Sequence, residues 1–358
     1  MAALQSLQQA IERFQAGDWA AAEQICRALL GSDPRQPDAL SLLAVIAAQT
    51  RRVPEAAALL ARAIAIQPND AALHNNFGNI LKDLGRLDEA LASYERAVKI
   101  QPGYADAHYN RAILLHARGA LMDAVASYRC AIRHNAHYSG AYFHLGNALY
   151  QLSRYEDALA SYEAVLVLQP QLAEAHNNRG TALYALRRHE EALLSYERAV
   201  GLKSDYAEAY NQRGNVLHEL GRFAQALASF EAAVRIKPAD AEAHYGCAIC
   251  LRDLGRMDLA VARYAKTVEL APDMPWIYGG WLHARMHICD WNDLGSNIGY
   301  LQQKIDAASE AVGPFATLCI SDSAQLQLRA AQIWIKGQQV EGARRLVEPP
   351  GPPGGHAA

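Results

Sequence analysis

Apolar residues recur along this chain at helical spacing within short segments. Leu84, Leu87, Leu91 and Tyr94, for example, lie three or four residues apart, which places them on one face of a helix. Glycines and prolines, which end helices, stand between such segments. The pattern predicts an all-α protein.

The pattern repeats every 34 residues. Counted from Ala3, eight blocks follow one another to Met274 without insertion or deletion: 3–36, 37–70, 71–104, 105–138, 139–172, 173–206, 207–240 and 241–274. We number the positions within each block from 1 to 34. A fixed period of this length is the sequence signature of stacked repeats.

A few positions of the block carry the signal. Position 20 is always alanine, position 8 is glycine or alanine, and position 24 is an aromatic residue from Tyr94 to Tyr264 in the last six blocks. Position 15 is glycine in five blocks, and position 32 is proline in six. Small residues let two helices approach closely, and the ring fills the space between neighbours. Glycine ends the first helix of a pair, and proline ends the second.

These positions resemble the tetratricopeptide repeat family over 272 of the 358 residues. The resemblance implies a right-handed α-solenoid, a superhelix of about eight helical hairpins followed by C-terminal helices. A single hairpin cannot bury its apolar face, whereas stacked neighbours can. The first two blocks lack the aromatic residue, and we expect them to act as a cap.

In this family the first helix of each hairpin lines a concave groove, and positions 2, 5, 6, 9, 12 and 13 face it. Polar residues occupy position 6 in Asn76, Asn110, His144, Asn178 and Gln212, and position 9 in Asn79, Asn147 and Asn215. A carboxamide both donates and accepts hydrogen bonds, so a row of them can bind a peptide backbone. The row resembles the asparagine ladder of protein O-GlcNAc transferases.

We therefore expect these eight residues to form a peptide-binding groove. His144, Gln212 and Gly246 depart from the asparagine pattern at position 6. The alternative for position 9 is that its asparagines hydrogen-bond neighbouring backbone within the array. A carboxylate clamp of the co-chaperone type is not expected, because the required cations are missing and position 2 is acidic in Asp106 and Glu242.

Residues 275–346 are expected to form capping or junction helices, and the proline- and glycine-rich residues 347–358 a disordered tail. The run MHICDWNDL, the linker Gly313-Pro314-Phe315 and the segment SDSAQLQLRAA, with a Ser-Asp-Ser helix cap, resemble the junction of bacterial O-GlcNAc transferase-like (SPINDLY-type) proteins. The resemblance implies descent from a glycosyltransferase. Too few residues follow for its catalytic region, so we expect a naturally short or truncated relative without enzymatic activity.

Composition and charge argue against nucleic acid and membranes as partners, and we expect proteins or peptides instead. The net charge of −3 argues against nucleic acid, which requires a basic patch. The longest apolar run, about ten residues, is shorter than a membrane span needs. The N-terminus lacks the features of a signal peptide, and six scattered cysteines suit a reducing compartment, so we expect a cytoplasmic protein. A homodimer remains open.

No cofactor or metal site is expected. Cys247 and Cys250 have metal-like spacing, but no second pair follows, and they fall where small residues pack. His283 and His287 lack the glutamate of a zinc-protease motif. The histidines that recur at position 4 are expected to pack between helices; they are His74, His108, His176 and His244.

Overall fold

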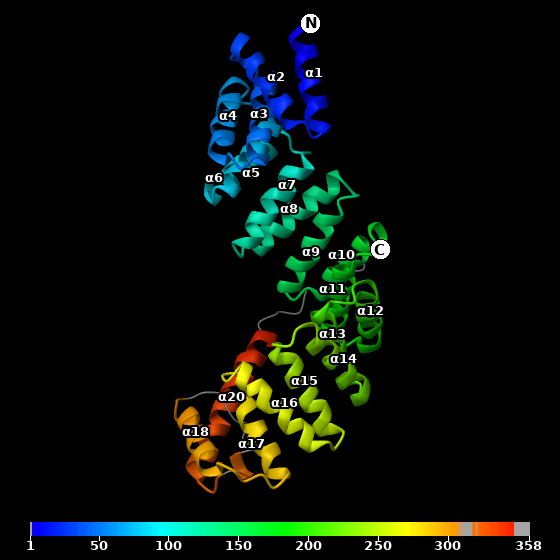
Figure 1. The fold of residues 1–358 in the computed structure, drawn as a ribbon, viewed down its shortest axis with the longest axis vertical. Coiled ribbons are helices and arrows are strands. Elements are labelled where there is room, and N and C mark those ends of the chain that lie inside the picture. Colours follow the sequence, from blue (N-terminus) through cyan, green and yellow to red (C-terminus); the bar gives the residue numbers. More distant parts are fainter. Residues whose placement is uncertain (1, 308–309, 311–316, 320, 347–358) are drawn as a thin grey trace, which may run out of the picture. The chain divides into compact units, whose positions relative to one another are not determined.

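The computed structural model describes residues 2–307, 310, 317–319 and 321–346, and all regular structure in these ranges is helical. It divides into two compact units, Met1–Leu186 and Arg187–Ala358 (Figure 1). The prediction of an all-helical repeat array of paired helices is confirmed. The linker 313–315 and the tail 347–358 lie outside the described residues.

The first unit is a series of helices joined by short turns, each in contact with the next along the chain (Figure 1). Its helices are α1 (Ala2–Gln15), α2 (Trp19–Ser32), α3 (Pro37–Gln49), α4 (Val53–Ile66), α5 (Ala71–Asp83), α6 (Leu87–Ile100), α7 (Ala105–Ala117), α8 (Leu121–His134), α9 (Ser139–Gln151), α10 (Tyr155–Leu168) and α11 (Ala173–Ala185).

The second unit continues the same alternation and adds three further helices to it. Its helices are α12 (His189–Leu202), α13 (Ala207–Glu219), α14 (Phe223–Ile236), α15 (Ala241–Asp253), α16 (Met257–Leu270), α17 (Ile277–His287), α18 (Leu294–Asp306) and α20 (Ala324–Leu346). From α3 to α16, every helix begins at position 1 or position 17 of its block.

The turn inside each block depends on a left-handed residue at position 15. At Gly85 the backbone N–H bonds the carbonyl of Lys82, and the next N–H, of Arg86, bonds that of Leu81. This pair of bonds satisfies carbonyls at the end of α5. The residue at position 15 has positive φ in all eight blocks, including three that are not glycine: Arg51, Ser153 and Arg187.

The aromatic residue at position 24 packs onto the first helix of its own hairpin. Tyr94 is fully buried, and a Cβ at Gly78 would lie 2.5 Å from its ring. The same relation joins Gly146 to Tyr162 at 2.6 Å. Glycine at position 8 is therefore required where the ring lies directly on the helix backbone, because no side chain fits between them.

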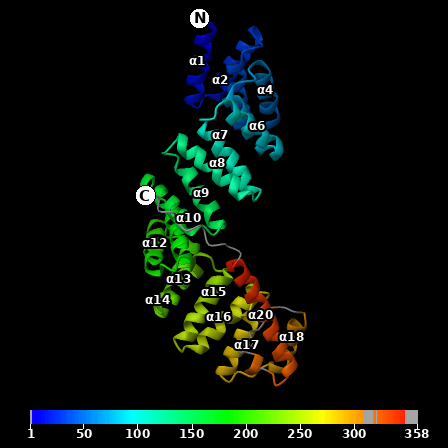
Figure 2. The ribbon, with the colours of Figure 1, turned by 180° about the vertical axis from the view of Figure 1, so that it is seen from behind.

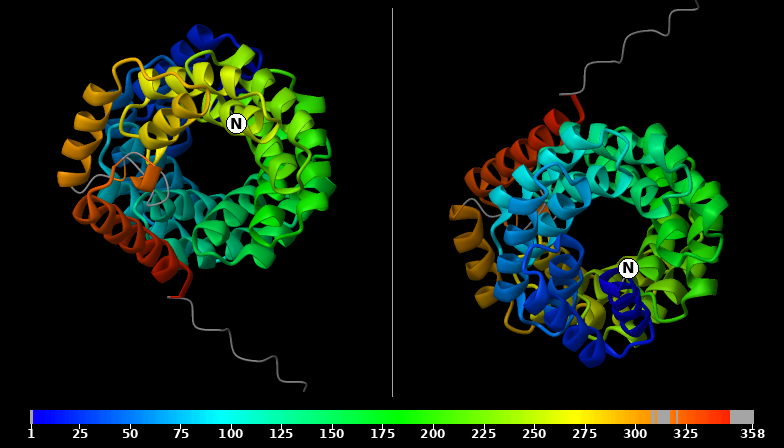
Figure 3. Two further views of the ribbon diagram at one scale, coloured as in Figure 1. Left: turned by 90° about the horizontal axis from the view of Figure 1, so that it is seen from below. Right: turned by 90° about the horizontal axis from the view of Figure 1, so that it is seen from above.

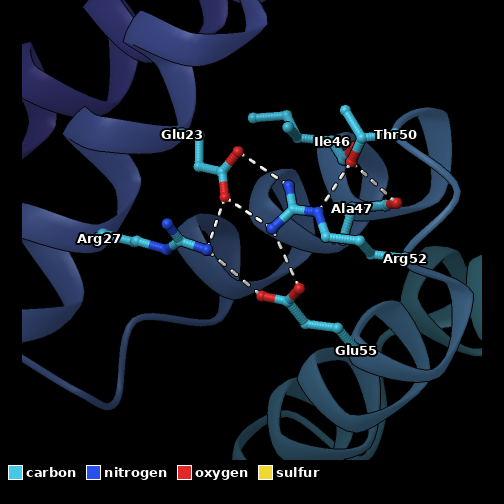
Figure 4. Close-up of polar contacts among 7 residues, drawn as sticks. All are labelled: Glu23, Arg27, Ile46, Ala47, Thr50, Arg52 and Glu55. Carbon is cyan, nitrogen blue, oxygen red and sulfur yellow. Dashed lines mark hydrogen bonds and ion pairs between the residues drawn. The ribbon is translucent and has the colours of Figure 1, made fainter.

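Ion pairs join the second helices of the first two blocks. The Arg52 guanidinium binds both oxygens of Glu23 at 2.8 Å and one oxygen of Glu55 at 3.0 Å, and Arg27 contacts Glu23 at 2.6 Å (Figure 4). The hydrogen bond from Arg52 lowers the pKa of Glu23. A two-point arginine–carboxylate contact fixes the geometry of both side chains and links consecutive blocks.

The C-terminal helices form a small core of their own. Helix α17 contacts α16 (Figure 2), and α18 lies beside α20 (Figure 3). Leu282, Leu301, Ile305 and Leu326 from these three helices are buried together. The expected cap at Ser-Asp-Ser forms, since the Ser323 hydroxyl accepts the backbone N–H of Leu326 at 3.3 Å.

Candidate functional site

The first helices of neighbouring hairpins lie against one another. In the first unit α5 contacts α7, α7 contacts α9, and α9 contacts α11; in the second unit α13 contacts α15. This layer of first helices carries all eight residues that the sequence selected for peptide binding, which therefore lie on helices that pack side by side within each unit.

Position 9 is tied to the aromatic residue of its own hairpin. The Tyr94 hydroxyl donates to Oδ1 of Asn79 at 2.7 Å, and the Tyr162 hydroxyl donates to Oδ1 of Asn147 at 2.8 Å. The alternative interpretation of an internal role thus fits these two asparagines, although the partner is a side chain and not the backbone. Asn215 is exposed, and the corresponding ring, Phe230, has no hydroxyl to offer it.

Position 6 is partly engaged between hairpins. The Nδ2 atom of Asn178 donates to Oδ1 of Asn147 at 2.9 Å, and that of Asn110 donates to Oδ1 of Asn75 at 2.9 Å. The side-chain amides of Asn76 and Gln212, both half-buried, make no hydrogen bond to the residues that the structure describes. Asn110 keeps its acceptor oxygen, whereas Asn178 Oδ1 receives a bond at 3.3 Å from its neighbour.

His144 behaves as an aromatic residue in this row. Its ring stacks on Tyr128 with a centroid separation of 6.2 Å and an interplanar angle of 16°, and it meets Phe143 edge-on at 5.5 Å. Burial lowers its pKa. A neutral imidazole among rings is a poor substitute for a carboxamide, so the row changes character here.

Gly246 interrupts position 6 in the last block for a packing reason. A Cβ at this residue would lie 2.5 Å from the ring of Phe230 in the preceding block. No larger side chain, and hence no carboxamide, fits at this position while the ring stays in place.

The position-4 histidines have a role that the sequence analysis did not identify. Each Nε2 lies 2.8–3.0 Å from the carbonyl oxygen of the proline six residues earlier. The signal was visible, because tyrosine replaces histidine in Tyr142 and Tyr210, the two blocks that follow Ala136 and Ser204 in place of proline. The four position-4 histidines therefore stabilise the turn that joins consecutive blocks.

The cysteine pair is part of the packing. Cys247 and Cys250 are buried, and burial raises the pKa of each thiol to about 12. A thiol with such a pKa is a poor metal ligand or nucleophile at neutral pH. Within the described ranges, no group of three or more histidine, cysteine or acidic residues could hold a metal ion. None of the described helices is both long and apolar enough to cross a bilayer.

Protein-family models match the repeat array. A tetratricopeptide repeat model matches residues 7–71, 143–207 and 211–275, a second matches 59–92, and a TPR repeat model matches 78–119. No curated protein matches the sequence.

Several solved structures are similar to parts of the chain. YrrB, described as a TPR protein with an unusual peptide-binding site, is 23% identical over 51% of this chain and 95% of its own, with a TM-score of 0.48. MamA is 22% identical over 47% of this chain and 92% of its own, with a TM-score of 0.45. The C-terminal part of a TPR repeat-containing protein from Cytophaga hutchinsonii is 18% identical over 67% and 98%, with a TM-score of 0.57, a likeness that shows the fold alone.

Proposed function

Because this chain belongs to the tetratricopeptide repeat family, we propose that it is a protein-interaction scaffold that binds extended polypeptide segments along its first helices. Stacked repeats present long surfaces built from the same position of successive units. Such a surface can bind a ligand whose own binding groups recur along its length. An extended polypeptide backbone is such a ligand, because it offers one donor and one acceptor at each residue.

The observation that carries the proposal is the set of amide groups left available on the layer of first helices. Asn76 and Gln212 are half-buried without a hydrogen bond among the described residues, and Asn215 is exposed. Asn110 Oδ1 also remains available, since its Nδ2 bonds Asn75 and its Oδ1 accepts no bond from the described residues. Amide groups held on packed helices can pair with peptide groups whatever the side chains of the ligand.

A mixture of randomised nine-residue peptides, passed over the immobilised full chain, tests the proposal. The paired substitution Asn76→Ala and Gln212→Ala should reduce the retained peptide several-fold, since each removes an available amide. Asn178→Ala is the matched control, because both of its amide atoms are already bonded, Nδ2 to Asn147 and Oδ1 to Asn177, and its loss should affect stability alone. Equal retention by the wild type and the paired variant would contradict a groove based on these amides.

The relationship to O-GlcNAc transferases receives no support from the comparisons, because the matching family models all describe the repeat. Within this stretch Leu301, Ile305 and Leu326 belong to a helical core with Leu282, as the residues of any capping segment would. We expect no sugar transfer from this chain. Incubation with a labelled nucleotide sugar and an acceptor protein would reveal any turnover.

A further inference from the structure

Three tyrosines gather around one carboxylate on the layer of first helices in the first unit. Tyr109 lies on α7, and Tyr138 lies just before α9; their ring centroids are 4.7 Å apart. Burial and the nearby charge of Asp106 raise the pKa of both Tyr138 and Tyr104, so the Asp106 carboxylate lies close to these two hydroxyls. The rings thus surround a negative charge.

The cluster is open on one side. Asp106 is exposed, and Tyr109 and Tyr138 are half-buried. Position 2 of the next block is Gly140, so this residue places no side chain over the Tyr109 hydroxyl, which lies 3.4 Å from where a Cβ would be. Beneath the cluster, Tyr128 is fully buried, and its hydroxyl has no partner in the part of the chain that the structure describes.

The charge of Asp106 is not neutralised in the described residues, where it forms no ion pair with lysine or arginine. The carboxylate therefore keeps its negative charge beside the tyrosine hydroxyls, and the faces of the surrounding rings are also electron-rich. Both features favour a cation at this place.

The chain itself shows what this ring position can bind. Tyr206 occupies position 34 two blocks after Tyr138, and the Lys203 ammonium lies 4.9 Å from its ring centroid. In the block of Tyr138, the position of Lys203 is held by Asn135, so the chain supplies no cation from there. No lysine or arginine lies over Tyr109 or Tyr138 among the described residues.

We propose that Asp106, Tyr109 and Tyr138 bind the guanidinium or ammonium group of an arginine or lysine in the captured segment. This inference rests on the proposed function and specifies it: the preferred ligand is a basic peptide, anchored at the junction of α7 and α9. The carboxylate supplies the charge and the rings supply the faces. Asp106 also lies in the first turn of α7, where its charge stabilises the helix. That role alone would change stability and not ligand choice.

The experiment uses the full chain, immobilised, and the same randomised nine-residue peptides, with the retained fraction sequenced by mass spectrometry. We expect arginine and lysine to be enriched about threefold to tenfold over the input. Asp106→Asn, which removes the charge and keeps the size of the side chain, and Tyr138→Leu should each remove most of this enrichment. Glu242→Gln is the matched control, since it is also an exposed acid at position 2 and forms no ion pair in the described residues.

The outcomes separate this inference from the proposed function. Retention of peptides without basic enrichment, or an equal loss of enrichment in Glu242→Gln and Asp106→Asn, would overturn the cation site and leave the scaffold intact. Retention of no peptide would overturn both. A second pair of probes, identical peptides with one arginine or one citrulline, separates charge from shape; equal affinity for the two would also overturn the site.

Discussion

The Nε2 atom of His108 lies 2.8 Å from the carbonyl oxygen of Pro102, across the turn that joins two blocks. A carbonyl oxygen only accepts, so Nε2 carries the hydrogen, and the buried Nδ1 has no partner within the part of the chain that the structure describes. The same bond recurs at His74, His176 and His244, which makes it a regular element of this array.

Replacing one of these histidines by a residue that cannot donate should destabilise the chain. His244 is buried, and His244→Leu leaves the Pro238 carbonyl without its donor, at an expected cost of about 1–2 kcal/mol in the free energy of unfolding. Denaturant titration followed by circular dichroism measures the change. His244→Gln, which can still donate, is the control; an equal loss in both variants would show that the bond is not the cause.

Stability should fall in mild acid. Burial lowers the pKa of His108 and of His144 in the folded chain, whereas an unfolded histidine titrates near 6.5. The unfolded state therefore binds protons that the folded state does not, and stability decreases as pH drops below about 6.5. Melting temperatures between pH 7.5 and 5 test this. His144→Phe should make the dependence shallower, and an unchanged slope would contradict the assignment.

Two equivalent tyrosines should respond oppositely to loss of the hydroxyl. Tyr162 donates to Asn147, so Tyr162→Phe should cost about 1 kcal/mol. Among the described residues the buried Tyr128 hydroxyl has no partner, because position 9 of its block is Ile113. Tyr128→Phe should then be neutral or stabilising. Urea unfolding of both variants decides, and a larger loss for Tyr128→Phe would refute the pairing argument.

The left-handed residue at position 15 offers a stabilising substitution. Ser153 has φ of 58°, and Ser153→Gly should stabilise the chain by about 1 kcal/mol, because glycine takes this conformation without strain. Gly119→Ser is the reciprocal variant: a Cβ there meets nothing within 4 Å, so any loss comes from the backbone. Thermal unfolding should move in opposite directions for the two variants.

The sequence predicted the helices well because their ends are marked by local chemistry. Glycine at position 15 and small residues at position 8 act within a few residues or one hairpin, and both appear in the structure as expected. The left-handed conformation of Arg51 and Arg187 was missed, since nothing in their side chains favours it. There the hairpin geometry overrides the residue's own preference.

The candidate site was harder to predict. A carboxamide at position 6 or 9 looks the same in sequence whether it faces a ligand or bonds a neighbour. The bond from Tyr162 to Asn147 spans 15 residues, and the bond from Asn178 to Asn147 spans 31. Which side chains meet across such sequence separations depends on how the helices stack, and a periodic sequence pattern does not specify that stacking.

The contacts within a hairpin and across the turn to the next one are short in sequence: 16 residues from the glycine to the ring that covers it, and six from proline to histidine. Excising or duplicating a whole 34-residue period would leave each of these contacts whole, whereas a cut of any other length would break several. Recombination within the gene can thus lengthen or shorten the protein by whole periods. The length of the array can then change in steps of one hairpin while the packing inside each hairpin stays the same.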